Sequence, residues 1–139
     1  MEIKKIDHIG IAVRDLDSAE DFYARLGLKV TREEAMKGMK IAFIPVGEIN
    51  IELIQSTTDD GVIAKFIGKR GEGVHHIAYE VQDVSSALRE LKAEGVRVVD
   101  EVPRKGADGK EVAFVHPESS YGVLIELVCK KKNDAKTLT

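Results

Sequence analysis

Two histidines and two glutamates occupy equivalent places in two similar stretches of this 139-residue chain. His8 and His76 each lie in an apolar run typical of a strand, and Glu52 and Glu126 each lie in the sequence Ile-Glu-Leu. A carboxylate that is buried without a partner costs several kcal/mol, so something positive must compensate it. Imidazole nitrogens and carboxylate oxygens are suitable ligands for Zn, Mn, Co and Fe. These four residues therefore predict a divalent-metal site, which points to an enzyme.

The chain repeats itself along its length. A shift of 68 residues aligns the two histidines, and a shift of 74 residues aligns the two glutamates. The growing shift predicts extra loop residues in the second half, where the stretch 104–110 contains two glycines. Each half has the pattern of one strand, one helix and three further strands, which predicts an α+β fold of two tandem βαβββ modules.

Hydrophobic periodicity gives the expected bounds of these elements. In the first half, Asp17 and Glu20 resemble a capping box at the start of a helix that Gly27 ends, and strands are expected at 6–13, 28–34, 39–46 and 49–56. In the second half we expect a helix at 84–94 and strands at 74–81, 96–101, 111–116 and 122–129. A short helix at about 60–70 joins the halves. The polar stretch 130–139 is expected to form a frayed tail.

Strand alternation indicates which histidines have a chemical role. His8 shares one face of its strand with the small residues Gly10 and Ala12, which leaves room beside the imidazole. His75 falls on the opposite face from His76, so we expect it to be structural. His116 precedes a proline and is expected to lie in a turn or loop.

Composition excludes several classes of protein. A net charge of −3, from 21 basic and 24 acidic residues, argues against a nucleic-acid binder with a broad basic surface. The sequence has no apolar signal core and no apolar stretch long enough to span a bilayer, so we expect a cytoplasmic protein with no membrane partner. The single Cys129 excludes an internal disulfide framework and is interpreted as structural.

Three motifs resemble one known family. They are Asp7–Val13, Gly73–Ile77, and Phe114–Pro117 followed by Gly122–Leu127. These stretches are similar to the methylmalonyl-CoA epimerase family of the vicinal oxygen chelate superfamily, and the similarity extends over roughly residues 5 to 130. The resemblance implies a single domain over 1–139, in which two repeats, about 5–58 and 73–130, form a cup-shaped mixed sheet around a metal site.

The same resemblance implies the activity and the ligands. It implies interconversion of (2R)- and (2S)-methylmalonyl-CoA by proton abstraction at C2, through an enolate that the metal stabilises. It also implies a homodimer with an acyl-CoA substrate and one divalent ion per chain, with Co, Mn, Zn and Ni as candidates. The metal ligands of the family map onto His8, Glu52, His76 and Glu126.

Epimerisation needs one acid–base group on each side of C2. The resemblance assigns Glu126 as ligand and base together. For the second group we favour Lys40, with Glu48 and a metal-bound water as alternatives. Basic side chains are expected to bind the phosphates of CoA, and the candidates are Lys65, Lys69, Arg70, Arg104, Lys105 and Lys110.

Three other functions fit the same fold. A glyoxalase I-type lyase or isomerase would act on a glutathione adduct with the same ligands. A dioxygenase commonly uses two histidines and one carboxylate, which makes it a weaker match. A metal-free module that sequesters small molecules would have no need for four ligand-type residues inside apolar strands.

Overall fold

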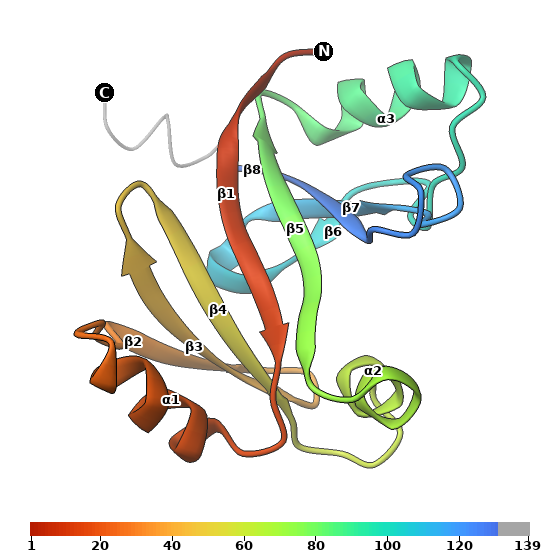
Figure 1. Ribbon diagram of the computed structural model, residues 1–139. Helices are drawn as coiled ribbons and strands as arrows, with labels where there is room; N and C mark the ends of the chain where they lie inside the picture. Colours follow the sequence, from red (N-terminus) through yellow and green to blue (C-terminus); the bar gives the residue numbers. More distant parts are fainter. Residues whose placement is uncertain (131–139) are drawn as a thin grey trace. The chain divides into compact units, whose positions relative to one another are not determined.

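A computed structural model describes residues 1–130 of the chain, and residues 131–139, which make up most of the expected tail, lie outside the described residues. Figure 1 shows the order of the elements along the chain. Their bounds are β1 (Ile3–Ala12), α1 (Leu16–Arg25), β2 (Arg32–Met36), β3 (Met39–Val46), β4 (Ile49–Ser56), α2 (Val62–Arg70), β5 (Gly73–Val81), α3 (Val84–Ala93), β6 (Arg104–Lys105), a short 3₁₀ turn (Ala107–Gly109), β7 (Glu111–Val115) and β8 (Ile125–Cys129).

The strands form one mixed eight-stranded sheet in the order β2-β3-β4-β1-β5-β8-β7-β6. The chain divides into two compact units. The first, which we call the N-terminal unit, is His8–His76. The second, the C-terminal unit, consists of Met1–Asp7 and the chain from Ile77 onward. Strands β1 and β5 therefore each contribute residues to both units. This arrangement confirms the predicted α+β fold with its repeated βαβββ pattern.

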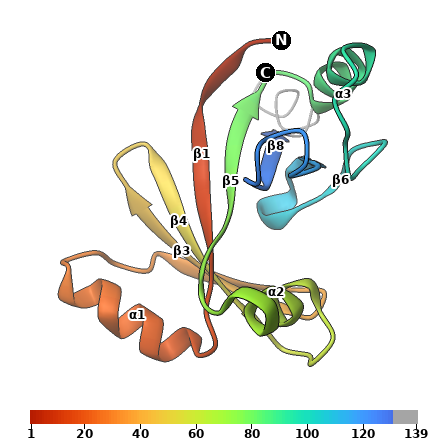
Figure 2. The same cartoon turned by 45° about the vertical axis from the view of Figure 1, so that its right-hand side comes forward.

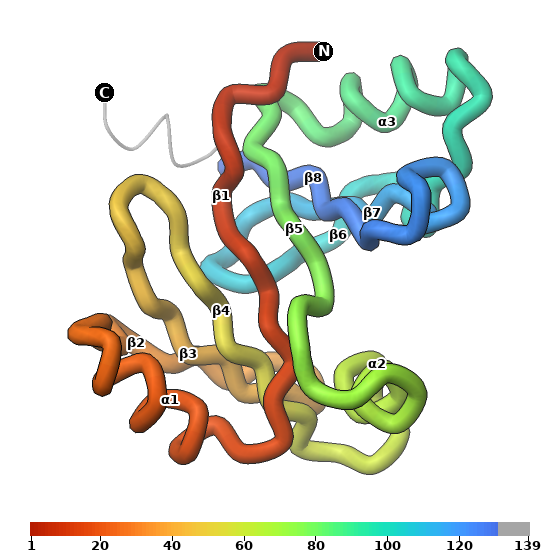
Figure 3. The backbone as a smooth tube through the Cα atoms, in the orientation of Figure 1, coloured from red at the N-terminus to blue at the C-terminus, as the bar shows by residue number. Residues whose placement is uncertain are grey.

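In the N-terminal unit, β1 runs parallel to β4, while β3 is antiparallel to both β4 and β2 (Figure 3). Helix α1 contacts β3 and β4. The buried core on this face consists of Val13, Leu16, Ala42, Ile44 and Leu53. Because side chains alternate along a strand, the residues between these point to the opposite face of the sheet. That opposite face carries His8 and Glu52.

The C-terminal unit repeats this pattern. Strand β5 runs parallel to β8, and β7 is antiparallel to both β8 and β6. Helix α3 packs on β7 and β8. Its buried core consists of Val81, Val84, Ala87, Leu88, Ala113, Val115, Leu127 and Cys129. Cys129 is thus a buried core residue, in agreement with the structural role expected for it.

Two predicted strands differ from the structure. The strand expected at 28–34 begins only at Arg32, because Leu28 donates its backbone N–H to Tyr23 at the end of α1 and packs as loop on the core. The strand expected at 96–101 is reduced to an isolated bridge between Val98 and Val115. There the Asp100 side chain accepts the backbone N–H of Phe114, in place of a ladder carbonyl.

The predicted capping box of the first helix is wrong. Helix α1 begins at Leu16, and Asp15 is its N-cap residue. Glu20 does not fold back onto the helix start but interacts with Glu33. The equivalent residue Asp83 caps α3 and accepts a hydrogen bond from Ser85 N. Among residues 1–130, no helix is long and apolar enough to cross a membrane.

Candidate metal centre

His8 on β1 and His76 on β5 face each other in the N-terminal unit. Each is only 5% exposed. Their Nε2 atoms lie 3.1 Å apart and their rings meet edge to face at 89°. Two neighbouring ligands at about 2.0–2.1 Å from a zinc-like ion are separated by about 3.0–3.4 Å. The separation of the two nitrogens therefore fits one edge of a coordination polyhedron.

Gly10 provides the space for the second imidazole. A Cβ at this position would lie 2.6 Å from Nδ1 and 2.7 Å from Nε2 of His76, well inside van der Waals contact. The sequence indicated that small residues beside His8 leave room for something. The room above Gly10 is filled by the other histidine, so the glycine is needed for close approach of the ring rather than for backbone freedom.

Glu52 contacts the other nitrogen of His8. The parallel register of β1 and β4 places Glu52 directly across from Gly10. Its Oε2 lies 3.3 Å from Nδ1 of His8, and the glutamate is 6% exposed. A carboxylate at Nδ1 fixes the ring orientation of a metal-binding histidine and leaves Nε2 as the ligand atom. In this arrangement Glu52 orients His8.

His76 is held on its far side by His75. The two Nδ1 atoms lie 2.9 Å apart. Burial, and then the neighbouring His8 and His75, lower the pKa of His76 well below its usual value. Burial also lowers the pKa of His75. The lowered pKa values keep His75 and His76 neutral, and the neutral form of His76 is the one that can bind a metal.

Glu126 occupies the equivalent environment in the C-terminal unit. It lies across from Ala78 on β5 and across from Phe114 on β7. Glu52 has the same two types of neighbour, a small residue on the parallel strand and Phe43 on the antiparallel one. Glu126 is likewise only 6% exposed. The duplicated register thus reproduces around Glu126 the environment of Glu52.

Lys40, which we favoured as the second acid–base group, is exposed on β3. It pairs across the sheet with Gln55. Because paired residues share a face, Lys40 lies on the face of the sheet opposite that of Phe43 and Glu52. A proton-transfer role for Lys40 stays a prediction, and its position on the sheet weighs against it.

Sequence analysis missed two arginines that stack on phenylalanines. The Arg32 guanidinium lies 3.9 Å from the centre of the Phe43 ring, and the Arg104 guanidinium lies 5.2 Å from that of Phe114. Each phenylalanine pairs directly with the glutamate of its own unit. The repeat of Ala-Phe in the two halves was the available signal, but only the register of β2 and β6 brings an arginine to each ring.

Other candidate positions have structural partners. His116 follows β7 in a turn and accepts the backbone N–H of Glu118, as expected for a turn residue. Lys110, a candidate for CoA phosphate binding, lies 3.3 Å from the Asp7 carboxylate.

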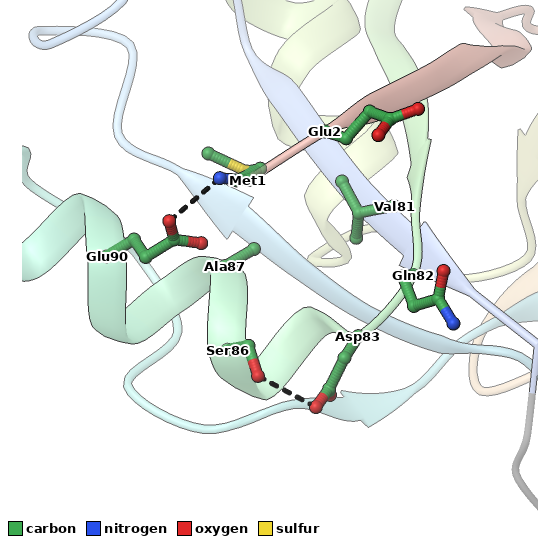
Figure 4. Close-up of a pocket in the computed structure, with 8 residues that line it drawn as sticks. All are labelled: Met1, Glu2, Val81, Gln82, Asp83, Ser86, Ala87 and Glu90. Atoms are coloured by element: carbon green, nitrogen blue, oxygen red, sulfur yellow. Dashed lines mark hydrogen bonds and ion pairs between the residues drawn. The ribbon is translucent and has the colours of Figure 1, made fainter.

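The C-terminal unit also has a pocket of about 210 Å³ beside α3, shown in Figure 4. Met1 and Glu90 line this pocket and form an ion pair at 2.8 Å between the Met1 amino group and Glu90 Oε1. None of the predicted site residues lines it.

The chemistry of the buried residues fits a divalent metal. Two buried imidazoles present Nε2 atoms at a ligand-to-ligand distance, and each unit has a buried glutamate with hard oxygen donors. Each ligand histidine has a partner at its Nδ1, as metal-binding histidines usually have.

Comparison with known proteins adds a family and relatives. The model of the Glyoxalase/Bleomycin resistance protein/Dioxygenase superfamily matches residues 7–114. YqjC, an uncharacterized protein of Bacillus subtilis, is 39% identical over 135 residues, which cover 95% of this chain and 96% of YqjC. The ethylmalonyl-CoA/methylmalonyl-CoA epimerase of Cereibacter sphaeroides is 38% identical over 130 residues, covering 90% and 97% of the two chains.

A solved structure is similar over nearly the whole fold. It is a variant of the Streptomyces coelicolor methylmalonyl-CoA epimerase in complex with 2-nitronate-propionyl-CoA. Its TM-score is 0.89 at 36% identity, and the match covers 94% of this chain and 97% of that one.

Proposed function

Because the chain belongs to the glyoxalase/bleomycin resistance protein/dioxygenase superfamily, we propose that it is a metal-dependent epimerase that interconverts (2R)- and (2S)-methylmalonyl-CoA. The similarity to epimerases extends over about nine-tenths of the chain. The observation that carries the proposal is the buried pair of Nε2 atoms at 3.1 Å, with a partner at each Nδ1.

The proposed metal centre consists of His8, Glu52, His76 and Glu126. The two histidines bind through Nε2, and Glu126 supplies a carboxylate from the second repeat. In this structure the Glu52 carboxylate contacts Nδ1 of His8 and orients that ring. To act as the fourth ligand, the carboxylate must turn away from Nδ1 of His8. Support for Glu126 comes from its burial and from a strand register that matches that of Glu52.

A bound divalent ion would supply a Lewis acid that draws charge from the thioester and carboxylate oxygens of the substrate. The chain's own part is to move the proton at C2. We assign Glu126 to proton transfer on one face of C2, because a carboxylate has two oxygens and can keep one for the substrate.

A second acid–base group must act on the other face of C2. Lys40 remains the proposed residue, and Glu48 and a metal-bound water remain the alternatives. Substituting Lys40 by Ala tests this directly. A loss of turnover with an unchanged KM would support Lys40, and unchanged turnover would remove it from the mechanism.

Proton–deuterium exchange at C2 of methylmalonyl-CoA in heavy water tests the proposed function. We expect exchange with the metal-loaded protein, loss of exchange with a chelator, and recovery when Co²⁺ or Mn²⁺ is restored. A fully metallated protein that exchanges no C2 proton would contradict the epimerase. Turnover of a glutathione hemithioacetal by the same sample would instead favour a glyoxalase I-type activity.

The acyl-CoA substrate, the homodimer and the cytoplasmic location were all expected from the sequence. We retain them as part of the proposal. Sedimentation analysis of the metal-loaded protein tests the dimer, and a monomer at all accessible concentrations would contradict it.

A further inference from the structure

We propose that His75 is a positioning residue, which holds His76 in its ligand orientation by accepting a hydrogen bond from Nδ1–H. The inference rests on the proposed metal centre. Its basis is the distance of 2.9 Å between the two Nδ1 atoms. This is a normal length for a hydrogen bond between nitrogens. The two rings are nearly perpendicular, at 88°, so they meet edge to face and do not stack.

The proton positions follow from the partners of His76. Its Nε2 lies 3.1 Å from Nε2 of His8. In the proposal it accepts a hydrogen bond from His8 Nε2–H in the metal-free protein, and it must be unprotonated to bind a metal. A neutral imidazole that is unprotonated at Nε2 carries its proton on Nδ1, so His76 donates and His75 accepts. His75 must then carry its own proton on Nε2. These tautomers are assigned from the hydrogen-bond pattern.

Helix α2 holds His75 in turn. The Phe66 ring lies edge to face against His75, with centroids 4.9 Å apart at an angle of 87°. Figure 2 shows the chain passing from α2 through a short turn directly into β5. The connecting helix therefore sets the orientation of the histidine beside the proposed ligand, and the aromatic contact leaves His75 Nδ1 directed at His76.

His8 and His76 thus have partners of different charge. His8 is held at Nδ1 by the Glu52 carboxylate, whereas His76 is held by a neutral imidazole. A carboxylate partner makes a histidine more basic and a stronger donor to the metal, while a neutral partner fixes orientation with less effect on basicity. We infer that His75 acts mainly by orientation.

Three substitutions at position 75 separate the hydrogen bond from packing. His75→Ala removes both. His75→Phe keeps an aromatic ring against Phe66 but has no acceptor. His75→Asn keeps an acceptor near the position of Nδ1. His116→Ala is the control, because it removes an imidazole from a turn.

The measurement is the affinity for Co²⁺, by competition with a chromophoric chelator, together with the visible spectrum of the Co²⁺ complex. Loss of an outer partner typically weakens metal binding about 10–100-fold. We expect a loss of this size for His75→Ala and His75→Phe, with an altered spectrum. His75→Asn should regain most of the affinity, and His116→Ala should match the wild type. Wild-type affinity in a folded His75→Phe variant would overturn the proposal.

Nitrogen-15 NMR of the imidazoles in the metal-free protein provides a test that does not depend on metal binding. We expect a protonated Nδ1 on His76 and an unprotonated Nδ1 on His75. A proton on His75 Nδ1 would overturn the proposal even if the protein binds metal. If the expected tautomers are found but no divalent ion binds, the positioning contact stands and the proposed metal-dependent function fails.

Discussion

At the scale of single residues, one glycine decides whether two imidazoles can share a site. The His76 ring lies over Gly10, where any side chain would collide with it. The strand pattern of His8, Gly10 and Ala12 showed that there was space beside His8, but not what fills it. The filling residue comes from a strand 68 positions later, so alternation within β1 alone gives no information about it.

Gly10→Ala should therefore disturb the site more than the fold. The added methyl group forces the His76 ring to move, and overpacking of this kind costs about 1–3 kcal/mol of stability. We expect Co²⁺ affinity to fall about 10-fold or more, because the His76 ring leaves its ligand orientation. Loss of a hydrogen-bond partner that orients a ligand has an effect of this size. Titration against a chelator and a thermal melt measure the two effects.

Gly68→Ala is the matched control for this change. Gly68 lies in α2, and a Cβ there would meet nothing within 4 Å. Alanine favours a helix over glycine by about 1 kcal/mol, so stability should hold or rise and Co²⁺ affinity should stay unchanged. Equal losses of affinity in both variants would contradict the role of Gly10.

At the scale of elements, α1 and β2 bring together two carboxyl groups, those of Glu20 and Glu33. The hydrogen bond to Glu33, burial and the charge of Glu33 raise the pKa of Glu20 to about 7. Oε2 of Glu20 is sheltered from solvent without another hydrogen-bond partner among the described residues. The apolar stripe of α1 was predictable, whereas this pair depends on where β2 begins.

The sign of the pH effect follows from linkage. A folded-state pKa above the usual 4.5 means that the folded protein binds this proton more tightly than the unfolded chain. The contribution to stability is full below pH 4.5 and is lost as pH rises through about 7. Glu20→Gln should therefore raise the melting temperature at pH 8 and change it little at pH 4. Equal shifts at both pH values would contradict the raised pKa of Glu20.

Each stacked arginine, Arg32 of β2 and Arg104 of β6, lies against the phenylalanine that pairs with the glutamate of its own unit. Each guanidinium also pairs with a nearby carboxylate, Arg32 with Glu34 at 3.2 Å and Arg104 with Asp100 at 3.3 Å. The carboxylate or a phosphate of an acyl-CoA would be a further anionic partner. We expect Arg32→Gln or Arg104→Gln to raise KM about tenfold, because a hydrogen bond to a charged group is worth about 1.5–3 kcal/mol. Steady-state kinetics with methylmalonyl-CoA measures this.

Arg14→Gln is the control for the arginine variants. Arg14 is exposed and, like the stacked arginines, pairs with a carboxylate, that of Glu72. Its substitution should leave KM unchanged. A similar rise in KM for all three variants would indicate a general effect of surface charge and would contradict a specific role for the stacked pairs.

At the scale of the whole molecule, the internal repeat made most of the fold predictable. Strands β3 and β4 have the predicted bounds, and the other helices and strands outside residues 26–38 and 94–110 lie within a few residues of theirs. The failures are in segments where a side chain or a helix end takes over a backbone hydrogen bond, as Asp100 does. Periodicity reports burial and not hydrogen-bond partners, so it cannot detect such replacements.

The candidate site was predictable in its residue types and not in its geometry. The repeated histidines and glutamates identified the buried polar positions correctly. The contact of Glu52 with Nδ1 of His8, and of His75 with His76, depends on side-chain orientations that strand parity does not determine. The alternation of side chains along β5 predicted that His75 lies on the opposite face of the strand from His76. Its Nδ1 nevertheless contacts Nδ1 of His76.

Metal binding should stabilise the chain as a whole, since the proposed ligands come from both repeats. A ligand at 100 times its Kd that binds only the folded state adds about 2.7 kcal/mol. We expect Co²⁺ to raise the melting temperature of the wild type and of His116→Ala, and to leave Glu126→Gln nearly unchanged. A full shift in the Glu126→Gln protein would contradict the part assigned to Glu126.

The central claim is that one divalent ion is bound by His8, His76 and Glu126. The most direct measurement is a crystal structure of the Co²⁺-loaded protein, with the ion located by its anomalous scattering. The account predicts one ion per chain, at about 2.0–2.2 Å from Nε2 of both histidines and from a carboxylate oxygen of Glu126. An ion bound elsewhere, or one that contacts the histidines without Glu126, would contradict it.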